Sequence, residues 1–266
     1  MGAKTWEGRR ILVTGASSGI GAALARELAR AGAIVGLCAR RTELLHDVLS
    51  ECRQWVPACR SWTVDLSDTE AVPDFVQRVE AELGDIDVLV NNAGLSLNAD
   101  AGSIPWGDVE YLTRLNYLAP VRLTQAVLPG MRARHSGQVL AVSSMAARLS
   151  TPGEAAYAAA KAALATYFEA LAAELLGSGV SVHLVFPALI DLTDGVDGDD
   201  SLADTADGTI RIPASVMARA MMRQLETGTL ELYMPHLMRG IVSRRARDVE
   251  ASVRFMSELY QADALH

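Results

Sequence analysis

Short apolar segments alternate with longer amphipathic segments along most of this chain. Apolar runs a few residues long, bounded by turn residues, are typical of strands buried on both faces, and segments with apolar residues on one side are typical of helices. The predicted strands cover residues 9–14, 33–39, 61–64, 86–90, 138–142, 180–186 and 230–234, and the predicted helices cover residues 20–31, 41–54, 68–83, 106–134, 153–176 and 213–226. This alternation predicts an α/β fold with a doubly wound parallel sheet of about seven strands and helices on both faces.

The length of 266 residues suits one domain, and no repeat or linker interrupts the pattern. Residues 191–207 contain seven aspartates, a composition that cannot form a core alone. We therefore predict a mobile substrate loop at about residues 188–212, with a solvated surface loop as the plainer alternative. A helical extension is predicted at about residues 236–262, and its mixture of apolar and basic residues suits a packed terminal helix better than a membrane surface or a partner subunit.

Composition excludes several classes of function. The 24 basic against 32 acidic side chains give a net charge of −8, which opposes nucleic-acid binding. The chain contains no uninterrupted apolar run of 18 residues, and residues 1–10 lack the apolar stretch of a secretory signal. Three cysteines, Cys38, Cys52 and Cys59, are an odd number without metal-ligand spacing. We expect reduced thiols, no metal site and a cytoplasmic protein.

A glycine-rich turn, residues 14–21, joins the first predicted strand to the first predicted helix. Glycines allow a tight turn there and let backbone N–H groups at the helix N-terminus bind a pyrophosphate. The context predicts a dinucleotide-binding loop, although a tight turn without a ligand is the alternative. The residues expected at the cofactor are Gly15, Ser17, Ser18, Gly19, Ile20 and Gly21.

Four further motifs follow in order: Asn91-Asn92-Ala93-Gly94, Asn116, Ser144 and Tyr157-Ala158-Ala159-Ala160-Lys161. Together with the glycine spacing, they resemble the short-chain dehydrogenase/reductase family over nearly all of the chain up to about residue 190. The resemblance implies a Rossmann-type fold and hydride transfer between a nicotinamide cofactor and a ketone, aldehyde or secondary alcohol. It also implies a homodimer or homotetramer. The further cofactor contacts that it implies are Arg40, Arg41, Asp65, Leu66, Asn92, Ala93, Gly94, Tyr157, Lys161, Pro187, Ala188 and Ile190.

By this resemblance, the catalytic residues are Asn116, Ser144, Tyr157 and Lys161. Ser144 hydrogen bonds the substrate oxygen, Tyr157 exchanges its proton, Lys161 also holds the nicotinamide ribose, and Asn116 anchors a water chain from Lys161. Ser143 is adjacent to Ser144, and successive residues at a strand end face opposite ways. The thirteen-residue offset from Tyr157 favours Ser144.

Tyr157 and Lys161 are four residues apart, so they share one face of a helix. A positive charge at ~5 Å, with an effective dielectric constant of ~20, stabilises a phenolate by ~3 kcal/mol, which is about two pKa units. We therefore expect Lys161 to lower the pKa of Tyr157 towards the range of general acid/base catalysis.

The end of the second predicted strand bears on the choice of dinucleotide. Ala39 occupies the position where an acidic residue would accept hydrogen bonds from the adenosine ribose, and Arg40 and Arg41 follow it. This pattern favours NADP(H), with NAD(H) as the alternative. Asp65 resembles the family residue that meets the adenine, or it is a helix cap together with Ser67 or Asp68.

Substrate contacts are expected from Ser144, Met145, Tyr157 and Leu189, and further contacts from Ser96, Leu97, residues 146–148 and Glu154. Two departures from the family pattern, Ala188 after Pro187 and the late position of Thr193, put the path of the chain there in question. The C-terminal extension is similar to the branch that handles lipophilic carbonyls. The alternatives are an NAD-dependent alcohol dehydrogenase and a non-catalytic dinucleotide-binding regulator or scaffold, which the intact Ser, Tyr and Lys set opposes.

Overall fold

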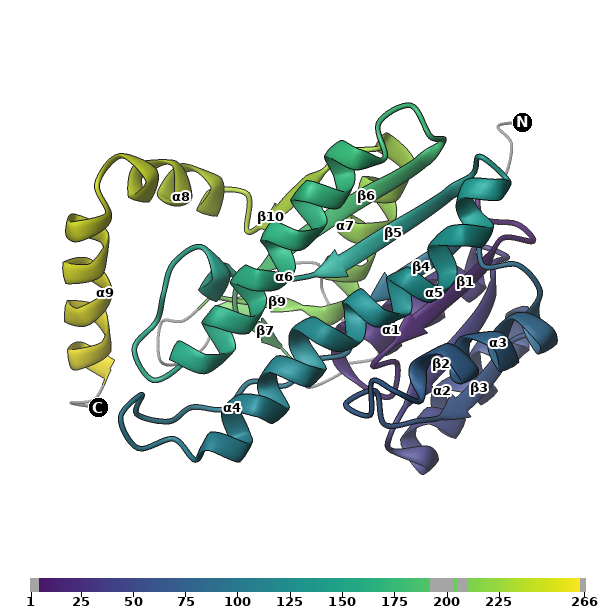
Figure 1. Ribbon diagram of the computed structural model, residues 1–266, viewed down its shortest axis with the longest axis horizontal. Coiled ribbons are helices and arrows are strands. Elements are labelled where there is room, and N and C mark those ends of the chain that lie inside the picture. The colour runs from purple at the N-terminus through teal and green to yellow at the C-terminus, as the bar shows by residue number, and fades with distance from the viewer. Residues whose placement is uncertain (1–4, 192–202, 205–209, 264–266) are drawn as a thin grey trace.

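The computed structural model describes residues 5–191, 203–204 and 210–263. Its main sheet has seven strands, all parallel, in the order β3-β2-β1-β4-β5-β6-β10 (Figure 1). The strands are β1 (Arg10–Thr14), β2 (Ile34–Ala39), β3 (Arg60–Thr63), β4 (Val88–Asn91), β5 (Gly137–Val142), β6 (Val180–Pro187) and β10 (Glu231–Met234). The predicted doubly wound, Rossmann-type sheet is confirmed.

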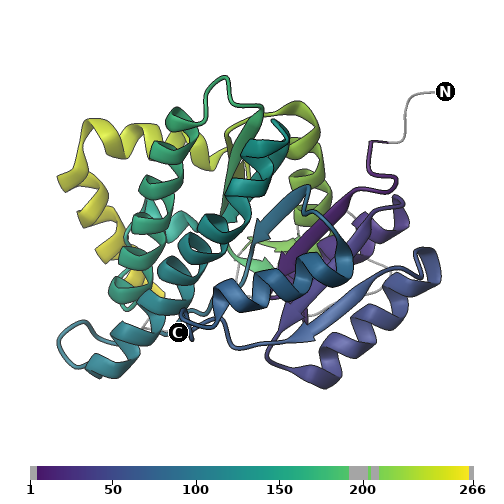
Figure 2. The ribbon, with the colours of Figure 1, turned by 45° about the vertical axis from the view of Figure 1, so that its right-hand side comes forward.

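Helices cover both faces of this sheet (Figures 1 and 2). One hydrophobic core lies under α1 (Gly19–Arg30), α2 (Thr42–Trp55) and α7 (Ala214–Thr227). The other core lies under α3 (Val72–Leu83), α5 (Ala119–Ala133) and α6 (Ala155–Glu174). The strands are apolar on both faces because each core takes alternate side chains, as Val13 and Leu12 of β1 do.

Strand order reverses at β1, which pairs with β2 on one side and with β4 on the other. Helical connections leave the sheet in opposite directions from this point, and a crevice forms at the carboxyl ends of the two strands. The glycine-rich turn and the Asn92–Gly94 segment follow β1 and β4 directly, so both lie at this crevice.

The prediction of one continuous α-helix over residues 106–134 is wrong in one respect, because a π-helical turn interrupts it. The segment consists of α4 (Trp106–Thr113), a π-helical turn η1 (Arg114–Leu118) and α5. The π turn carries Asn116, and such turns occur frequently at functional sites because they redirect a side chain without ending the helix. The helix predicted from residue 68 begins only at Val72, with Pro73 in its first turn.

Residues 188–212 contain strands that the sequence did not predict. β7 (Ile190–Asp191) pairs parallel with β9 (Ile210–Pro213), and β8 (Ala203–Asp204) pairs antiparallel with β9. Residues 192–202 and 205–209 of the predicted mobile loop, including Thr193, lie outside the described residues.

The C-terminal extension is two helices, α8 (Met238–Arg247) and α9 (Val249–Asp263), rather than one stretch. Asp248 separates them, and its carboxylate accepts a hydrogen bond of 2.9 Å from the Ala251 N–H, as an N-cap does. Met238, Ile241, Val242 and Met256 pack against the core that includes α6. Over the described ranges, no helix combines the length and apolar character that a membrane crossing needs.

Candidate active site

The glycine-rich turn is held by close backbone contact. Gly15 and Gly19 have φ of +67° and +53°, which favour glycine. A Cβ atom at Gly15 would lie 2.8 Å from the Ala93 Cα atom, and one at Gly21 would lie 2.5 Å from Asn92 Nδ2. Residues larger than glycine therefore cannot occupy these positions without moving the Asn92–Ala93 segment.

Thr14 connects this turn to the segment after β4. Its buried hydroxyl donates to the Val90 carbonyl at 3.1 Å and accepts from the N–H groups of Asn92 and Ala93, each at 2.9 Å. Asn92 Nδ2 in turn donates to the Thr14 carbonyl at 2.8 Å. Thr14 was not predicted as a site residue, although its position at the end of β1, directly before the first glycine, distinguishes it.

Of the two arginines that follow β2, Arg41 contacts this turn and Arg40 contacts α4. Arg41 Nε and Nη2 donate to Ser17 Oγ at 3.3 and 3.1 Å, and Arg41 also donates to Ser18. Arg40 instead donates to the Tyr111 hydroxyl and lies over its ring, with 5.8 Å between guanidinium carbon and ring centroid. Tyr111 was not expected at the site, since nothing in its local sequence distinguishes it.

The residues of the turn fit a phosphate-bearing cofactor. Ser18 is the N-cap of α1 but makes no capping side-chain hydrogen bond within the described part of the chain. The first N–H groups of a helix have no partner in the helix, so those of α1 are available to an anion. The Arg41 guanidinium beside Ser17 and Ser18 adds a positive charge at the same place.

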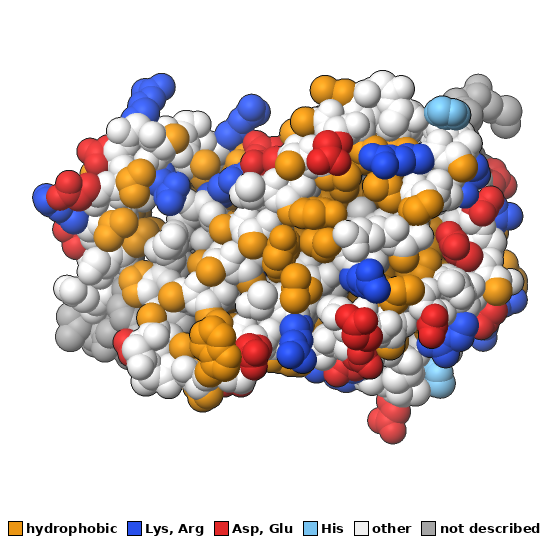
Figure 3. Space-filling model, in the orientation of Figure 1, with side chains coloured by type: hydrophobic (Ala, Val, Ile, Leu, Met, Phe, Trp, Pro, Cys, Tyr) orange, Lys and Arg blue, Asp and Glu red, His pale blue; other side chains and the backbone are white. Residues whose placement is uncertain are grey.

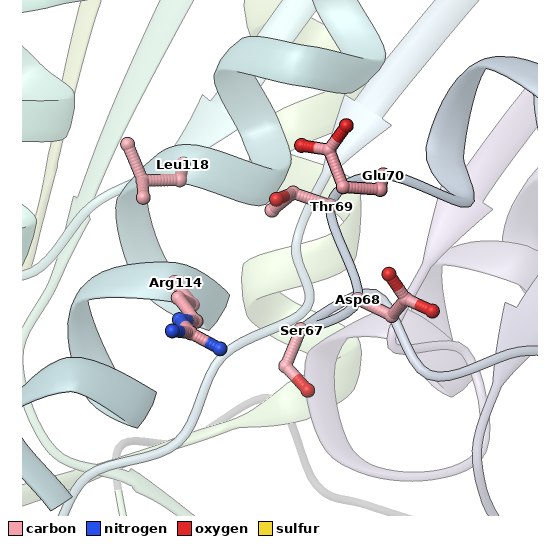
Figure 4. Close-up of a pocket in the computed structure, with 6 residues that line it drawn as sticks. All are labelled: Ser67, Asp68, Thr69, Glu70, Arg114 and Leu118. Carbon is pink, nitrogen blue, oxygen red and sulfur yellow. The ribbon is translucent and has the colours of Figure 1, made fainter. Parts of the chain in front are cut away.

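Asp65 does not cap a helix, so that alternative is wrong. Its Oδ1 accepts from the Ser67 N–H at 2.9 Å and from Ser67 Oγ at 2.8 Å, in a turn that ends before α3 begins. Leu66 beside it is buried. Figure 4 shows the neighbouring cavity of about 440 Å³, into which Arg114 extends from η1 towards residues 67–70.

Ser144, and not Ser143, lies beside Tyr157. Ser144 follows β5 and caps a short 3₁₀ helix, η2 (Met145–Ala147), by accepting from the Ala146 N–H at 3.1 Å. Its hydroxyl lies close enough to the phenol of Tyr157, on α6, to lower the pKa of that group. Ser143 points the other way and donates to the Lys161 carbonyl at 2.9 Å.

Lys161 and Asn116 meet at Gly94. Lys161 is only 4% exposed, and its Nζ atom donates to the Val142 carbonyl at 2.8 Å. Asn116 is buried, and its amide accepts from the Leu95 N–H at 3.2 Å and donates to the Leu95 carbonyl at 2.9 Å. A Cβ atom at Gly94 would lie 2.7 Å from Asn116 Oδ1 and 3.1 Å from Lys161 Nζ. The structure thus brings together all four residues predicted to be catalytic.

The expected lowering of the Tyr157 pKa is wrong, because this pKa is raised. Burial raises the pKa of Tyr157 and outweighs the hydrogen bond from Ser144, which lowers it, while the negative charge of Glu154 raises it further. Burial also lowers the pKa of Lys161 from 10.5 to about 8. The ammonium lies 5.9 Å from the centroid of the Tyr157 ring and is hydrogen bonded elsewhere, so its charge does not compensate the phenolate for lost water.

Met145 and Leu189, which are also expected at the substrate, follow the neighbouring strands β5 and β6 at their carboxyl ends. Met145 is buried in η2, whereas Leu189 is 52% exposed after β6. Ala188 donates from its N–H to the Met234 carbonyl at 2.9 Å, and its φ is ordinary, since among the described non-glycine residues only His135 has a positive φ. Ala188, the departure from the family pattern after Pro187, therefore introduces no backbone strain. Ile190 lies in β7, paired with Ile212.

Comparisons with known proteins agree with this geometry. The family described as short chain dehydrogenase matches residues 9–201. A short chain dehydrogenase of Pseudocercospora fijiensis is 39% identical over 198 residues, which are 73% of this chain and 63% of that protein. A dehydrogenase/reductase SDR family protein 7-like of Drosophila melanogaster is 37% identical over 187 residues, 69% of this chain and 57% of that protein.

A solved structure extends the similarity to the whole fold. The short-chain dehydrogenase from Streptomyces avermitilis superimposes with a TM-score of 0.80 at 30% identity, covering 96% of this chain and 98% of that one. The chain spans only about three fifths of the length of the two curated relatives, 63% and 57%. With the family match over most of the sequence and the motif residues gathered at one crevice, this chain belongs to the short-chain dehydrogenase family.

Proposed function

We propose that this chain is an NADP(H)-dependent oxidoreductase that transfers a hydride between nicotinamide and a ketone, an aldehyde or a secondary alcohol, as an alcohol dehydrogenase or carbonyl reductase. The observation that carries the proposal is the Ser144 hydroxyl beside the Tyr157 phenol, with Lys161 four residues further along the same helix face. The crevice beside them ends in the glycine-rich turn and the N-terminus of α1.

The side chains of this set divide the proton chemistry. When bound, the nicotinamide supplies or accepts the hydride. Tyr157 stays protonated at neutral pH because burial raises its pKa, so it is ready to donate a proton to a carbonyl oxygen. Ser144 donates or accepts a hydrogen bond at the same oxygen. Lys161, with a pKa of about 8, exchanges protons near neutrality and is positioned with Asn116 around Gly94.

The preference for NADP(H) is supported by Arg40 and Arg41. Both guanidinium groups follow Ala39 directly, and Arg41 lies at the turn that would hold the adenosine side of the cofactor. Structures from Burkholderia phymatum, in complex with NAD, and Thermococcus sibiricus, with 5-hydroxy-NADP, share the fold at TM-scores of 0.82 and 0.73. At 19% and 24% identity these structures share the fold alone, so their cofactors do not indicate which cofactor this chain prefers. The preference is therefore inferred from the two arginines.

A lipophilic substrate is supported by the exposed Leu189 and the neighbouring Met145. A second candidate, reduction of a ketoacyl group, is favoured by the ketoacyl reductase HetN of Nostoc. That protein is 30% identical over 228 residues, 86% of this chain and 79% of its own length. An acyl thioester therefore belongs among the substrates to be tested.

We also propose a homodimer or homotetramer in the cytoplasm. On the face shown in Figure 3, hydrophobic side chains gather over α5 and α6 and charged side chains lie mostly around them. Tyr167 of α6 and Tyr117 of the preceding π turn η1, which make an edge-on contact with 6.3 Å between centroids, are partly buried beside them. The cytoplasmic location is supported by three buried cysteines that are free thiols.

The test is cofactor consumption with a panel of aliphatic, aromatic and steroidal ketones and aldehydes, quinones and an acyl thioester. We expect turnover with NADPH and at least tenfold weaker kcat/KM with NADH. Turnover with NADH alone supports the NAD-dependent alternative. Tight binding of NADPH without turnover of any carbonyl contradicts the proposal and supports a dinucleotide-binding regulator.

A further inference from the structure

Glu154 carries a negative charge at the edge of the proposed catalytic set. It is the N-cap residue of α6 and precedes Tyr157 by three positions and Lys161 by seven. These spacings place the carboxylate, the phenol and the ammonium along one side of the helix. Lys161 is buried at one end of this stripe, whereas Glu154 is partly exposed at the other.

The Glu154 carboxylate is held in place by the segment that follows Gly94. Ser96 Oγ donates to Glu154 Oε1 at 2.9 Å, and the residue before Ser96, Leu95, is bound through both of its peptide groups by Asn116. Three residues further on, the Ala99 N–H donates to the Gly153 carbonyl at 2.8 Å. The carboxylate is therefore tied, through two neighbouring residues, to a side chain of the catalytic set.

The charge of Glu154 is not neutralised locally. Among the residues that the structure describes, no basic side chain forms an ion pair with it. Arg148, on the turn after Ser144, is bound instead by Glu169 and by Glu231, the latter at 3.1 Å. Lys161 donates to the Val142 carbonyl and not to Glu154. Asp100, on the segment that follows Ser96, accepts from the Gly102 N–H at 2.9 Å. The field of Glu154 reaches the phenol, since it contributes to the raised pKa of Tyr157.

We infer that Glu154 selects substrates by charge, so that the site takes neutral or cationic carbonyl compounds and rejects those with a carboxylate or phosphate close to the carbonyl group. This inference rests on the proposed function. Substrate that reaches the Tyr157 hydroxyl must pass close to an unpaired carboxylate in a partly water-excluded site. Like charges about 6 to 8 Å apart in such a place change binding roughly tenfold or more, depending on solvent screening.

The experiment compares 4-methylbenzaldehyde, 4-carboxybenzaldehyde and 4-(trimethylammonio)benzaldehyde as substrates with NADPH. In Glu154→Gln, kcat/KM for the carboxylate relative to the methyl compound should rise roughly tenfold, and that for the trimethylammonium compound should fall. Comparing ratios between variants cancels the intrinsic reactivity of each aldehyde. Glu174→Gln, an exposed acid at the last position of α6, makes the same change in net charge and should leave both ratios within about twofold.

Ser96→Ala separates the charge from the hydrogen bond. It removes the Ser96 hydroxyl but keeps the carboxylate, so the same ratios should again stay within about twofold of the wild type. Turnover of the methyl compound with ratios in Glu154→Gln that match the wild type would overturn the inference and leave the proposed function intact.

If the wild type reduces neither these aldehydes nor any carbonyl compound of the panel, the proposed function fails, and an ultraviolet titration of the tyrosines decides the inference. Tyr157→Phe identifies the signal of that phenol. A lower pKa of Tyr157 in Glu154→Gln than in the wild type is the expected result, because a negative charge has been removed. An unchanged pKa would show that Glu154 exerts no field at the site and would overturn the inference.

Discussion

Replacement of Lys161 by methionine should make the fold less dependent on pH. Lys161 is 4% exposed, and burial lowers its pKa from 10.5 to about 8. Between these two values the unfolded chain binds more protons than the folded protein, so the free energy of unfolding rises with pH in this window. The buried amine therefore lowers the free energy of unfolding by about 3 kcal/mol at about pH 7 and by about 1.4 kcal/mol at about pH 9.5, as an order of magnitude.

The assay is urea unfolding of the wild type and Lys161→Met at these two pH values, without cofactor. The free energy of unfolding of the wild type relative to the variant should rise by about 2 kcal/mol from the lower to the higher pH. The hydrogen bond to the Val142 carbonyl is lost at both pH values, so it cancels in this comparison. A difference that stays constant within about 0.5 kcal/mol would refute the placement of a titrating amine in the interior.

Three further substitutions test the cofactor turn and the catalytic set. Arg41→Ala should raise the Kd for NADPH about ten- to a hundredfold, measured by calorimetry, because a charge-assisted hydrogen bond to phosphate is lost; an equal rise for NADH would contradict this role. Gly94→Ala should lower kcat/KM at least tenfold because a Cβ atom would lie 2.7 Å from Asn116 Oδ1. The control, Gly107→Ala in α4, places a Cβ atom where nothing lies within 4 Å and should keep the wild-type rate. Equal rates in both variants would show that Asn116 and Lys161 need no fixed position. Thr14→Val should lower the free energy of unfolding, measured in urea, by about 2 kcal/mol or more, because the N–H groups of Asn92 and Ala93 lose their acceptor. An unchanged midpoint of urea unfolding would mean that water replaces the hydroxyl.

Much of the fold follows from local patterns in the sequence. The seven strands of the main sheet and the helices between them were predicted within a few residues, because a parallel sheet buried on both faces leaves a hydrophobic run at most of its strands. The π turn at Arg114–Leu118 has no such signal, since a helix of 3.6 residues per turn and one that is locally wider have the same composition. The strands β7, β8 and β9 are two to four residues long, too short for any periodicity.

The membership of the site was easier to predict than its electrostatics. Ser144, Tyr157 and Lys161 stand at fixed offsets in the sequence, and strand alternation separates Ser144 from Ser143. The direction of the Tyr157 pKa depends on burial and on the charge of Glu154, which raise it and outweigh the lowering by Ser144. The contacts of Arg40 with Tyr111 and of Thr14 with Asn92 join residues more than seventy positions apart, which no local pattern reveals.

The most direct test of the central claim is the rate of NADPH consumption by the wild type and by Tyr157→Phe, both saturated with cofactor, on the carbonyl compounds of the panel. Removal of one hydroxyl leaves the ring and the turn at Ser17 unchanged, so the Kd for NADPH should stay within about threefold while kcat falls by about 10² or more. Equal rates in the two proteins would contradict the assignment of proton transfer to Tyr157 and, with it, the account of this site.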